Sequence, residues 1–567
     1  MDEQKMTGYA SIDKPWLKYY TEEAITAPLP ECSMYEYLAQ KIKGRESLTA
    51  LNYFGTKISY GRLKREIDRA ASAFAALGVK AGDIVTICAV TTPEVVYSIY
   101  GVNKLGAVCN IIEPRVNIEQ IMQRTQQAQS RIIVLCDVFY SKLSSMIDQL
   151  GLTAIIIPIS GSMPLTKRLA ISSAGKMPHW KGSAWKEFIA HGSVSGISPF
   201  YEKDHTAAII YTGGTTGISK GVMLSDDAVN SVAHQYQYTL CAGIKAGHKF
   251  LDIMPPFIAY GFVCGLHMPL SGGVEVVVIP KFEPERFAQL IKKHKPNYFL
   301  GVPSHYEGLI HSGELDGVDL SFIEVAGMGG DALRTSAERE INAFFASHGL
   351  ALAVDKGYGM TEMCSSVCTT GANTNDLGSV GVPLPNCTVA IFEQGTDREL
   401  KYGESGEICI KGPGMMLGYF NNPDETEKVI KRHSDGSNWV HSQDIGYMTE
   451  NGSLFIVGRM KRMLIRPDGH NVWPSQIESV ICSHPAVAQC SVVGQRVDGS
   501  KSGVLPAAFV VVNGEHEHER LRQELIRLNF EKLPERDAAQ YYYFIDALPL
   551  TPVGKVDYRR LEEMANK

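Results

Sequence analysis

Eleven consecutive residues, 211 to 221, combine the side chains and the backbone freedom that suit a phosphate-binding loop: Y-T-G-G-T-T-G-I-S-K-G. Its glycines let the chain turn several amide N–H groups toward one anion at close range. Hydroxyl donors and a positive charge come from Thr212, Thr215, Thr216, Ser219 and Lys220. The segment therefore predicts a loop that surrounds phosphate groups.

The residues on either side predict how this loop is positioned. The preceding apolar run, A-A-I-I-Y, is typical of a buried strand that ends near Tyr211. The following stretch, S-D-D-A-V-N-S-V-A-H-Q-Y, begins like a helix with Ser225 as its N-cap. We therefore expect the positive end of a helix dipole to favour an anion in the same region.

Two other motifs compete for the same residues. The P-loop of nucleotide triphosphatases requires serine or threonine directly after its lysine, whereas Gly221 follows Lys220 here. G-I-S-K-G, 217 to 221, does satisfy G-x-S-x-G, the nucleophile elbow of α/β-hydrolases. That elbow needs a strand running directly into its first glycine, but six glycine or threonine residues follow Tyr211. A flexible linker has no need of three threonines and a lysine, so the phosphate loop is favoured.

The overall composition excludes several classes of protein. The 567 residues are 44% hydrophobic and 20% charged, as in soluble globular proteins. A net charge of -6 and the lack of a basic stripe with interleaved aromatics argue against nucleic acid as a partner. The first residues include acids and no apolar core, unlike a secretory signal, and no apolar run approaches the ~18 residues of a transmembrane span. Twelve cysteines without paired zinc-site spacing suggest buried, reduced thiols in a cytoplasmic protein.

Short β-branched runs alternate with amphipathic stretches along most of the chain. Residues 83–90 and 131–137 indicate buried strands, and residues 93–106 indicate a helix that ends at a glycine. Such alternation is typical of βαβ units with largely parallel sheets. The composition changes after Gly458, so we expect one domain over 1–460 and a second over 461–567.

One segment, 162 to 181, has basic residues and no acids. A solvated loop explains it, and the alternative is a patch that contacts a membrane surface.

Six motifs in a fixed order resemble the adenylate-forming superfamily, which includes acyl- and aryl-CoA synthetases, adenylation domains of peptide synthetases and luciferases. The resemblance covers the chain from about residue 58 to its last lysines. The motifs are Y-T-G-G-T-T-G-I-S-K-G (211 to 221), Y-G-M-T-E (358 to 362), G-E-I-C-I-K-G-P-G-M-M-L-G-Y-F-N-N-P-D-E-T (406 to 426), W-V-H-S-Q-D-I-G-Y (439 to 447), G-R-M-K-R-M-L-I-R-P-D-G-H-N-V-W-P-S-Q-I-E (458 to 478) and P-L-T-P-V-G-K-V-D-Y-R-R-L (549 to 561).

The resemblance implies an α/β fold with a large N-terminal domain of βαβ subdomains and a small, mobile C-terminal α+β lid domain. It also implies a reaction in two halves. A carboxylate attacks the α-phosphate of ATP to give an acyl-adenylate and pyrophosphate, and a thiol then displaces AMP. The implied cofactors are ATP, Mg²⁺ and coenzyme A, or the phosphopantetheine of a carrier protein.

The resemblance also implies roles for single residues. Tyr358 would lie beside the adenine, and Thr361 would contact the α-phosphate. Glu362 would hold Mg²⁺, a hard cation that prefers oxygen ligands. Asp444 would accept both ribose hydroxyls, since a carboxylate has two acceptor oxygens. The full set of cofactor-binding residues is Thr212, Gly214, Thr215, Thr216, Lys220, Gly357, Tyr358, Gly359, Asp444, Arg459, Arg466 and Gly469.

Lys555 in P-V-G-K-V is the catalytic residue that the resemblance implies, together with Thr361 and Glu362. During adenylation, negative charge builds on the pentavalent phosphorus and on the departing pyrophosphate. A cation delivered there stabilises the transition state more than the ground state.

The acid-binding pocket is expected where the superfamily builds it. In amino-acid-activating relatives, an aspartate near this region pairs with the substrate amine. The corresponding stretch here, M-P-P-F-I-A-Y-G-F (254 to 262), has no acid, and a buried ammonium without a partner would be costly. The apolar character of the site suits a fatty or aryl acid, and core packing is the alternative for its aromatic residues. The expected substrate-binding residues are Phe257, Tyr260, Gly261, Val302, Ser304 and Gly329.

Three residues depart from the superfamily pattern. Gln443 stands where relatives have a glycine, Ile258 where many have a histidine, and Arg462 at a hinge that is usually aspartate or lysine. The principal interpretation is an acyl-CoA synthetase acting on a small-molecule carboxylic acid. Two alternatives stay open: a ligase that loads an acyl carrier protein, and a non-catalytic nucleotide-binding regulator on the same fold.

Overall fold

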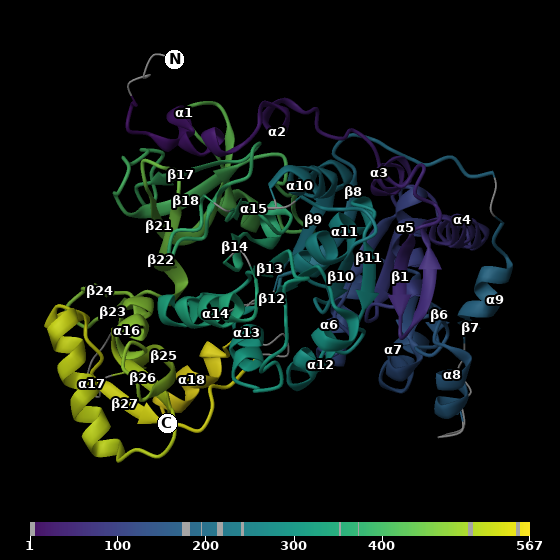
Figure 1. Ribbon diagram of the computed structural model, residues 1–567. Helices are drawn as coiled ribbons and strands as arrows, with labels where there is room; N and C mark the ends of the chain where they lie inside the picture. Colours follow the sequence, from purple (N-terminus) through teal and green to yellow (C-terminus); the bar gives the residue numbers. More distant parts are fainter. Residues whose placement is uncertain are drawn as a thin grey trace.

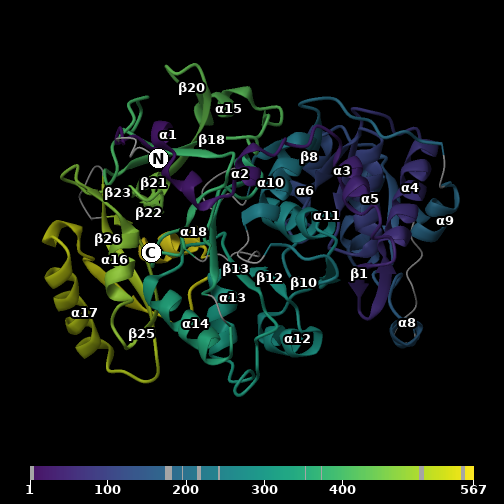
Figure 2. The same cartoon turned by 45° about the horizontal axis from the view of Figure 1, so that its top comes forward.

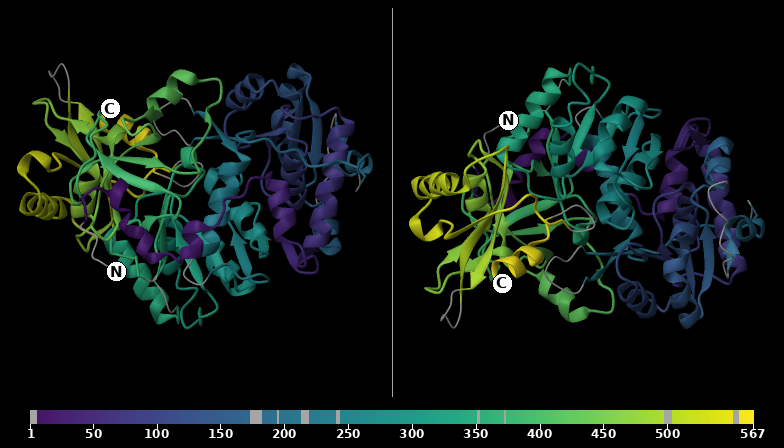
Figure 3. Two further views of the ribbon diagram at one scale, coloured as in Figure 1. Left: turned by 90° about the horizontal axis from the view of Figure 1, so that it is seen from above. Right: turned by 90° about the horizontal axis from the view of Figure 1, so that it is seen from below.

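The structure is a computed structural model that describes residues 6–172, 182–193, 196–212, 219–239, 243–350, 353–371, 373–496, 503–550 and 556–567. Two large mixed sheets and one antiparallel sheet form the main body, and a smaller unit follows at the C-terminus (Figure 1). Views from above and below place this C-terminal unit (yellow) and the helices and strands of about residues 60–160 (purple to blue) at opposite ends of the molecule (Figure 3).

The first large sheet has eight strands in the order β19-β9-β8-β4-β3-β5-β6-β7. Strands β8, β4, β3, β5, β6 and β7 run parallel, while β9 and β19 are antiparallel additions at one edge. This arrangement confirms the strands predicted over 83–90 and 131–137. The strand bounds are β3 Ile84–Cys88, β4 Val108–Ile111, β5 Ile132–Cys136, β6 Thr153–Ile157, β7 Ser183–Ala184, β8 Thr206–Tyr211, β9 Gly221–Ser225 and β19 Gly418–Tyr419.

The second large sheet has nine strands in the order β16-β15-β14-β13-β12-β10-β11-β1-β2. Its central strands, from β14 to β1, are parallel, as the alternating sequence pattern predicts. The strand bounds are β1 Thr49–Tyr53, β2 Thr56–Ser59, β10 Lys249–Asp252, β11 Glu275–Val278, β12 Tyr298–Gly301, β13 Val325–Met328, β14 Asp355–Tyr358, β15 Cys368–Thr369 and β16 Val382–Pro383.

Helices cover the faces of these sheets. The predicted helix over 93–106 is α5, Pro93–Lys104, and every one of its residues is buried because α3 (Met34–Lys41) and α4 (Tyr60–Ala76) pack against it. The helices that bear on the site are α10 Asp226–Thr239, the π-helix η3 Tyr260–His267, α11 Met268–Ser271, α13 Pro303–Ile310, α14 Thr335–Ser347 and α15 Pro423–Val429.

The third sheet was not predicted, because its strands pair antiparallel and, apart from α15 between β18 and β20, do not alternate with helices. Its order is β17-β18-β21-β20, with β22 on β21. The strand bounds are β17 Thr388–Phe392, β18 Gly406–Lys411, β20 Ile430–Arg432, β21 Asn438–Met448 and β22 Leu454–Arg459.

The N-terminal residues form a strap across this third sheet (Figure 1). Helix α1, Ala10–Asp13, packs on β17, and its Ser11 amide donates to Glu399 at 2.9 Å. Tyr402 donates to Asp13 at 3.1 Å, and the Trp16 side chain is fully buried beside Gly452. Residues 10–16 are therefore held by residues some four hundred positions later.

The C-terminal unit has its own sheet and core. Strand β22 leads into η6, Met460–Arg462, and from there into the unit (Figure 2). The remaining bounds are β23 Leu464–Ile465, β24 Asn471–Val472, α16 Pro474–Ile481, β25 Val487–Arg496, β26 Val504–Val512, α17 His518–Lys532, β27 Tyr541–Phe544 and α18 Tyr558–Ala565. The predicted division at 460/461 falls within η6. That residues 1–460 and 461–567 form separate domains stays a prediction.

Two further expectations concern single features. The described cysteines are free thiols, buried except for the partly exposed Cys490. Among the described residues, no helix has both the length and the apolar character that crossing a membrane requires.

Candidate functional site

The glycine-rich segment connects two antiparallel strands, β8 and β9, which pair as far as Tyr211 and Gly221. Three hydrogen bonds close its base: the Thr212 amide to the Lys220 carbonyl at 2.9 Å, the Lys220 amide to Thr212 Oγ1 at 3.2 Å, and Ser219 Oγ to the Thr212 carbonyl at 2.6 Å. The hydroxyls of Thr212 and Ser219, which were predicted to contact phosphate, therefore form hydrogen bonds within the base of the loop. Gly214, Thr215 and Thr216 lie outside the described residues.

The prediction that a helix dipole favours an anion at this loop is wrong. Ser225 does cap α10, since its Oγ accepts the Ala228 amide at 3.1 Å. However, the five-residue strand β9 lies between the loop and the helix. A strand of that length spans about 17 Å, so the N-terminus of α10 is at the opposite end of β9 from the loop.

Two residues that the sequence analysis did not single out surround Lys220. Strand β19 pairs with the start of β9, which brings Tyr419 beside Lys220, with the ammonium nitrogen 4.6 Å from the ring centroid. The Tyr419 hydroxyl donates to Glu362 Oε1 at 2.7 Å. Glu425 on α15 forms an ion pair with Lys220. Both residues belong to the 406 to 426 motif, and their sequence separation from Lys220 concealed the contacts.

The residues predicted to bind adenosine are brought together. Asp444 is 2% exposed, and it accepts the Tyr358 hydroxyl on Oδ2 at 2.7 Å and Arg459 Nε on Oδ1 at 2.8 Å. Pairing of β21 with β22 sets Asp444 opposite Arg459. The charge of Asp444 raises the pKa of Arg459, and burial together with this carboxylate raises that of Tyr358. Each Asp444 oxygen keeps acceptor capacity for a further donor.

The substitution of glycine by Gln443 preserves the local backbone. Gln443 has a φ of +61°, the left-handed region that glycine adopts most readily. Its amide donates to Glu407 Oε1 at 3.2 Å, and the other oxygen of Glu407 contacts His441 Nδ1 at 2.9 Å. A second histidine, His433, lies 2.9 Å from His441 Nε2. This buried chain of polar groups fixes the peptide that precedes Asp444.

Among the described residues, Glu407, Cys409 and His441 also form the one group of three potential metal ligands, with ligand atoms within 4.8 Å of one another. Because Glu407 hydrogen-bonds both His441 and the Gln443 amide, the arrangement has a sufficient structural explanation.

The turn after Tyr358 requires glycine at 359. A Cβ there would lie 1.5 Å from the Ser365 carbonyl oxygen, so no other residue fits without moving the backbone. This close approach folds Thr361 and Glu362 into a short 3-10 helix, Thr361–Met363. Thr361 is partly exposed, and Glu362 is 9% exposed.

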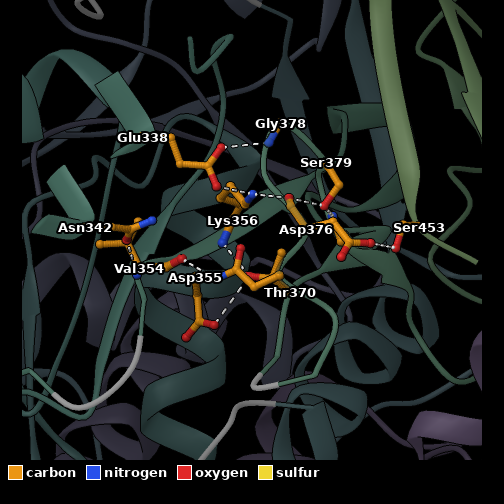
Figure 4. A network of polar contacts seen from close by, with 12 residues as sticks. Glu338, Asn342, Val354, Asp355, Lys356, Thr370, Asp376, Gly378, Ser379 and Ser453 are labelled. Carbon is orange, nitrogen blue, oxygen red and sulfur yellow. Dashed lines mark hydrogen bonds and ion pairs between the residues drawn. The ribbon is translucent and has the colours of Figure 1, made fainter. Parts of the chain in front are cut away.

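Strand β14, which carries Gly357 and Tyr358, is anchored by a buried polar network (Figure 4). Lys356 Nζ pairs with Glu338 on α14 at 2.5 Å and donates to the Asp376 carbonyl at 2.8 Å. The other oxygen of Glu338 accepts the Gly378 amide at 2.9 Å. Burial lowers the pKa of Lys356, while Glu338 opposes that shift.

The surroundings of Glu362 suit a magnesium ion. One carboxylate oxygen accepts the Tyr419 hydroxyl, and the second oxygen has capacity for a cation. Within the described residues, Glu362 belongs to no group of three potential ligand side chains. Mg²⁺ is typically bound through one or two carboxylates together with substrate phosphates, so this donor set fits the ion.

Most of the predicted acid-binding residues gather near Gly329. A Cβ on Gly329 would lie 3.7 Å from the Tyr260 hydroxyl and 3.1 Å from the Gly357 carbonyl, so this glycine joins the expected acid pocket to β14. A Cβ on Gly330 would lie 3.7 Å from Val302 Cγ1. Gly261 packs against the Pro255 carbonyl, which its Cβ would meet at 2.0 Å. Ser304 is exposed, and the buried Phe257 ring lies under Arg115 at 5.4 Å.

An apolar cavity of about 20 Å³ lies between strands of the second sheet and helices α10 and α11. The hydroxyls of its two tyrosines are engaged elsewhere: Tyr236 contacts Ser366, and Tyr298 accepts the Lys245 amide. The lining residues are Tyr236, Ile244, Phe250, Met268, Pro269, Val274, Tyr298, Leu300 and Val325.

The predicted lid residues lie in the C-terminal unit. Gly469 forms the turn of the β23–β24 hairpin with a φ of +82°, and Arg466 begins that turn. Among the described residues, Arg466 Nε and Nη1 have no acceptor, and no hydrogen bond joins Arg466 to Asp444 or Tyr358. At the hinge, Arg462 pairs with Glu478 at 2.5 Å and lies over the Tyr558 ring at 3.8 Å. Lys555 is outside the described residues.

Comparison with known proteins places these features in a family. The model of the AMP-binding enzyme family matches residues 38–420, and that of the AMP-binding enzyme C-terminal domain matches residues 476–555. A long-chain-fatty-acid–CoA ligase of Bacillus subtilis (strain 168) is 29% identical, over 97% of this chain and 98% of its own. A probable 4-coumarate–CoA ligase 2 of Dictyostelium discoideum is 30% identical, over 88% of each chain.

A solved structure of similar fold is that of the ATP-bound RpMatB-BxBclM chimera B1. It superposes with a TM-score of 0.81 at 25% identity, over 94% of this chain and 99% of the other. These matches confirm both the resemblance to the adenylate-forming superfamily and the predicted fold class, a large α/β main body with a small C-terminal domain.

Proposed function

This chain belongs to the family of AMP-binding enzymes, and from that premise we propose that it uses ATP to join a carboxylic acid to coenzyme A. The observation that carries the proposal is the hydrogen-bonded arrangement of Tyr358, Asp444 and Arg459 beside the Thr361–Glu362 turn. This arrangement offers a ribose acceptor and a partner for the α-phosphate in one place. The relatives named as CoA ligases support the reaction class.

In the first half-reaction, a carboxylate oxygen of the acid attacks the α-phosphorus and pyrophosphate leaves. Asp444 orients the ribose by accepting its hydroxyls, and Thr361 donates to the α-phosphate. Lys220 and the glycine loop bind the remaining phosphates. Lys555 carries positive charge to the departing pyrophosphate, where charge grows as the bond breaks.

Mg²⁺ bound at Glu362 would neutralise phosphate charge. Tyr419 positions Glu362 by donating to one of its oxygens, and the other oxygen would hold the ion.

In the second half-reaction, the sulfur of a thiol attacks the acyl carbon, AMP leaves, and the thiol proton is released. Coenzyme A is the thiol that the two CoA-ligase relatives support. Gly469 and the β23–β24 hairpin are the proposed contacts of the pantetheine arm.

The acid that suits this site is a fatty or aryl acid. Tyr260 and Val302 supply mostly apolar surface near Gly329 and Gly330, and Phe257 is buried. A hydrocarbon chain or ring packed against such side chains would lose no hydrogen bonds to water, whereas a polar substrate would.

The test is pyrophosphate exchange into ATP with a panel of fatty, aryl and amino acids. We expect exchange with apolar acids and none with amino acids. Lys555→Ala should reduce the exchange rate by about 10²–10³-fold, as loss of one transition-state donor typically does. Exchange that Lys555→Ala leaves unchanged would contradict the role of Lys555.

Absence of exchange with every acid would favour the non-catalytic regulator. Replacing coenzyme A by a holo carrier protein separates the two ligase alternatives.

A further inference from the structure

Lys220, the cation of the phosphate loop, already has a carboxylate partner in this structure. Its ammonium group pairs with Glu425 Oε2, and the two side chains are 23% and 30% exposed. The contact lies over the Tyr419 ring, which also confines the lysine from one side. A group that is meant to bind phosphate is therefore held by an anion from another element, α15.

Glu425 has a second cation within reach on its own helix. Lys428, one turn further along α15 and 65% exposed, contacts Glu425 Oε1 at 2.5 Å. These two lysines lower the pKa of Glu425 to about 2, so the carboxylate is charged at any physiological pH. If Lys220 leaves Glu425, the carboxylate keeps Lys428 as a partner and is never left as an isolated charge.

A triphosphate and Glu425 would compete for the same ammonium group. The β- and γ-phosphates carry several negative charges, and like charges brought to one cation repel each other. Binding of the triphosphate therefore requires Lys220 to exchange Glu425 for phosphate oxygens. Any free energy that holds Lys220 on Glu425 weakens the apparent affinity for ATP, because only the released state is competent to bind.

We propose that Glu425 is a positioning residue that acts as a latch on Lys220: the triphosphate displaces it, and Lys428 then holds it. The inference rests on the proposed function, since it requires that the glycine loop bind phosphates. Glu425 lies outside the reacting groups, and its contact with Lys220 lowers the apparent affinity for ATP.

The latch also acts on the product. After adenylation, pyrophosphate occupies the place of the β- and γ-phosphates. When Lys220 returns to Glu425, pyrophosphate loses its contact with Lys220, and its release becomes faster. AMP lacks those two phosphates, and its binding should be independent of the latch.

The experiment measures binding of ATP and AMP to the full-length protein and inhibition by pyrophosphate in the wild type and four variants. Glu425→Gln removes the charge of the latch, and we expect ATP to bind about threefold to tenfold more tightly, with AMP unchanged. Inhibition by pyrophosphate should strengthen by a similar factor. Lys428→Met should act in the opposite direction, because Glu425 then has Lys220 as its main partner.

The matched control is Glu427→Gln, which removes an exposed carboxylate from the same helix. It should leave ATP and AMP binding unchanged. In Glu425→Gln/Lys428→Met, the effect of the lysine change should disappear, since Lys428 acts only through Glu425.

Weaker ATP binding by Glu425→Gln, or equal shifts for ATP and AMP, would overturn the latch while leaving the enzyme assignment intact. Wild-type protein that binds no ATP and catalyses no pyrophosphate exchange would instead overturn the proposed function. Opposite shifts from Glu425→Gln and Lys428→Met cannot arise from general unfolding, so the pair also controls for loss of structure.

Discussion

At the scale of single residues, Gln443 combines an unfavourable backbone conformation with a central position. Its φ of +61° lies in the left-handed region, where residues other than glycine are strained. Asp444 directly follows Gln443 in the chain. The Gln443 amide hydrogen bond to Glu407 compensates part of this strain. Because the contact uses the backbone, the side chain at 443 is free to change.

Gln443→Gly should therefore stabilise the protein. We expect an increase of about 0.5–1 kcal/mol in the free energy of unfolding, since the left-handed conformation costs other residues about 1–2 kcal/mol and glycine's greater unfolded-state entropy offsets part of that gain. Denaturant titration measures the change. Gln443→Ala keeps the Cβ and should show no gain. A loss of stability in the glycine variant would indicate that the Gln443 side chain itself contributes.

Asp226 gives the protein a dependence on pH. Burial raises its pKa from 3.8 to about 7, although the Met34 amide and Asn103 donate to its Oδ1, each at 2.7 Å. A folded-state pKa above the unfolded value means that the folded protein binds this proton more tightly. The stability from this group is therefore present below pH 4 and is lost as the pH rises through 7.

Asp226→Asn should remove this loss, since the amide oxygen can still accept both hydrogen bonds. We expect the variant to match wild type near pH 4 and to exceed it at pH 8 by on the order of 4 kcal/mol, since each of about three pKa units is worth about 1.4 kcal/mol. Thermal unfolding at the two pH values measures the difference. An equal shift at both values would mean that Asp226 does not titrate in this range.

The residues that the sequence predicts to bind adenosine do lie together, whereas the residues that surround them were not predicted. Tyr358, Asp444 and Arg459 sit in three separate motifs, and the structure joins them in one set of hydrogen bonds. Tyr419 and Glu425 could not be predicted, because their contacts with Glu362 and Lys220 arise from the pairing of β19 with β9 across about two hundred residues. No local pattern reports such a pairing.

At the scale of elements, strand β14 depends on a buried ion pair. Lys356 and Glu338 have side-chain exposures of 5% and 2%, and each makes a further hydrogen bond to the backbone (Figure 4). Breaking a buried pair leaves an uncompensated charge. The strand leads directly to Tyr358, so this pair links stability to the adenosine site.

Lys356→Met and Glu338→Leu should each destabilise the protein by about 3–5 kcal/mol. The double change Lys356→Met/Glu338→Leu should cost less than the sum of the two, because it leaves no unpaired buried charge. Chemical denaturation of the three variants measures the coupling. Additive losses would show that the two side chains act independently of each other.

Element-level prediction succeeded where local pattern and fold agree. Strands β3 and β5 match their predicted ranges because buried parallel strands are uniformly apolar. Helix α5 matches its predicted range as well. The prediction of a helix N-terminus next to the glycine-rich loop failed. Strand β9 has only five residues, and the sequence pattern does not distinguish it from the start of α10. The antiparallel third sheet was also missed, since its hairpins follow one another in a region assigned by motif alone.

At the scale of the whole molecule, Arg334 links the main body to the C-terminal unit. Its guanidinium donates to the Ala488 carbonyl at 2.8 Å and pairs with Glu307 on α13 at 2.7 Å. The exposed Lys461 lies in η6, at the predicted boundary between the two domains. Contacts of this kind determine how often the boundary opens.

Arg334→Ala should increase the rate of tryptic cleavage after Lys461 about threefold to tenfold, as the loss of 1–1.5 kcal/mol from a partly buried charged hydrogen bond predicts. Gel electrophoresis with mass spectrometry of the fragments follows the reaction. Arg339→Ala, an exposed change on α14, the helix that follows Arg334, serves as the control. Cleavage that starts elsewhere in the chain would contradict the division at 460/461.

The N-terminal strap has a consequence for synthesis of the chain. Ser11, Asp13 and Trp16 find their partners at Glu399, Tyr402 and Gly452, so residues 11–16 have nothing to dock on until the third sheet is synthesised. At about 5–20 residues per second, that interval is roughly 20 to 90 s. For that time the large indole of Trp16 is exposed on a nascent chain, where it is a natural target for chaperones.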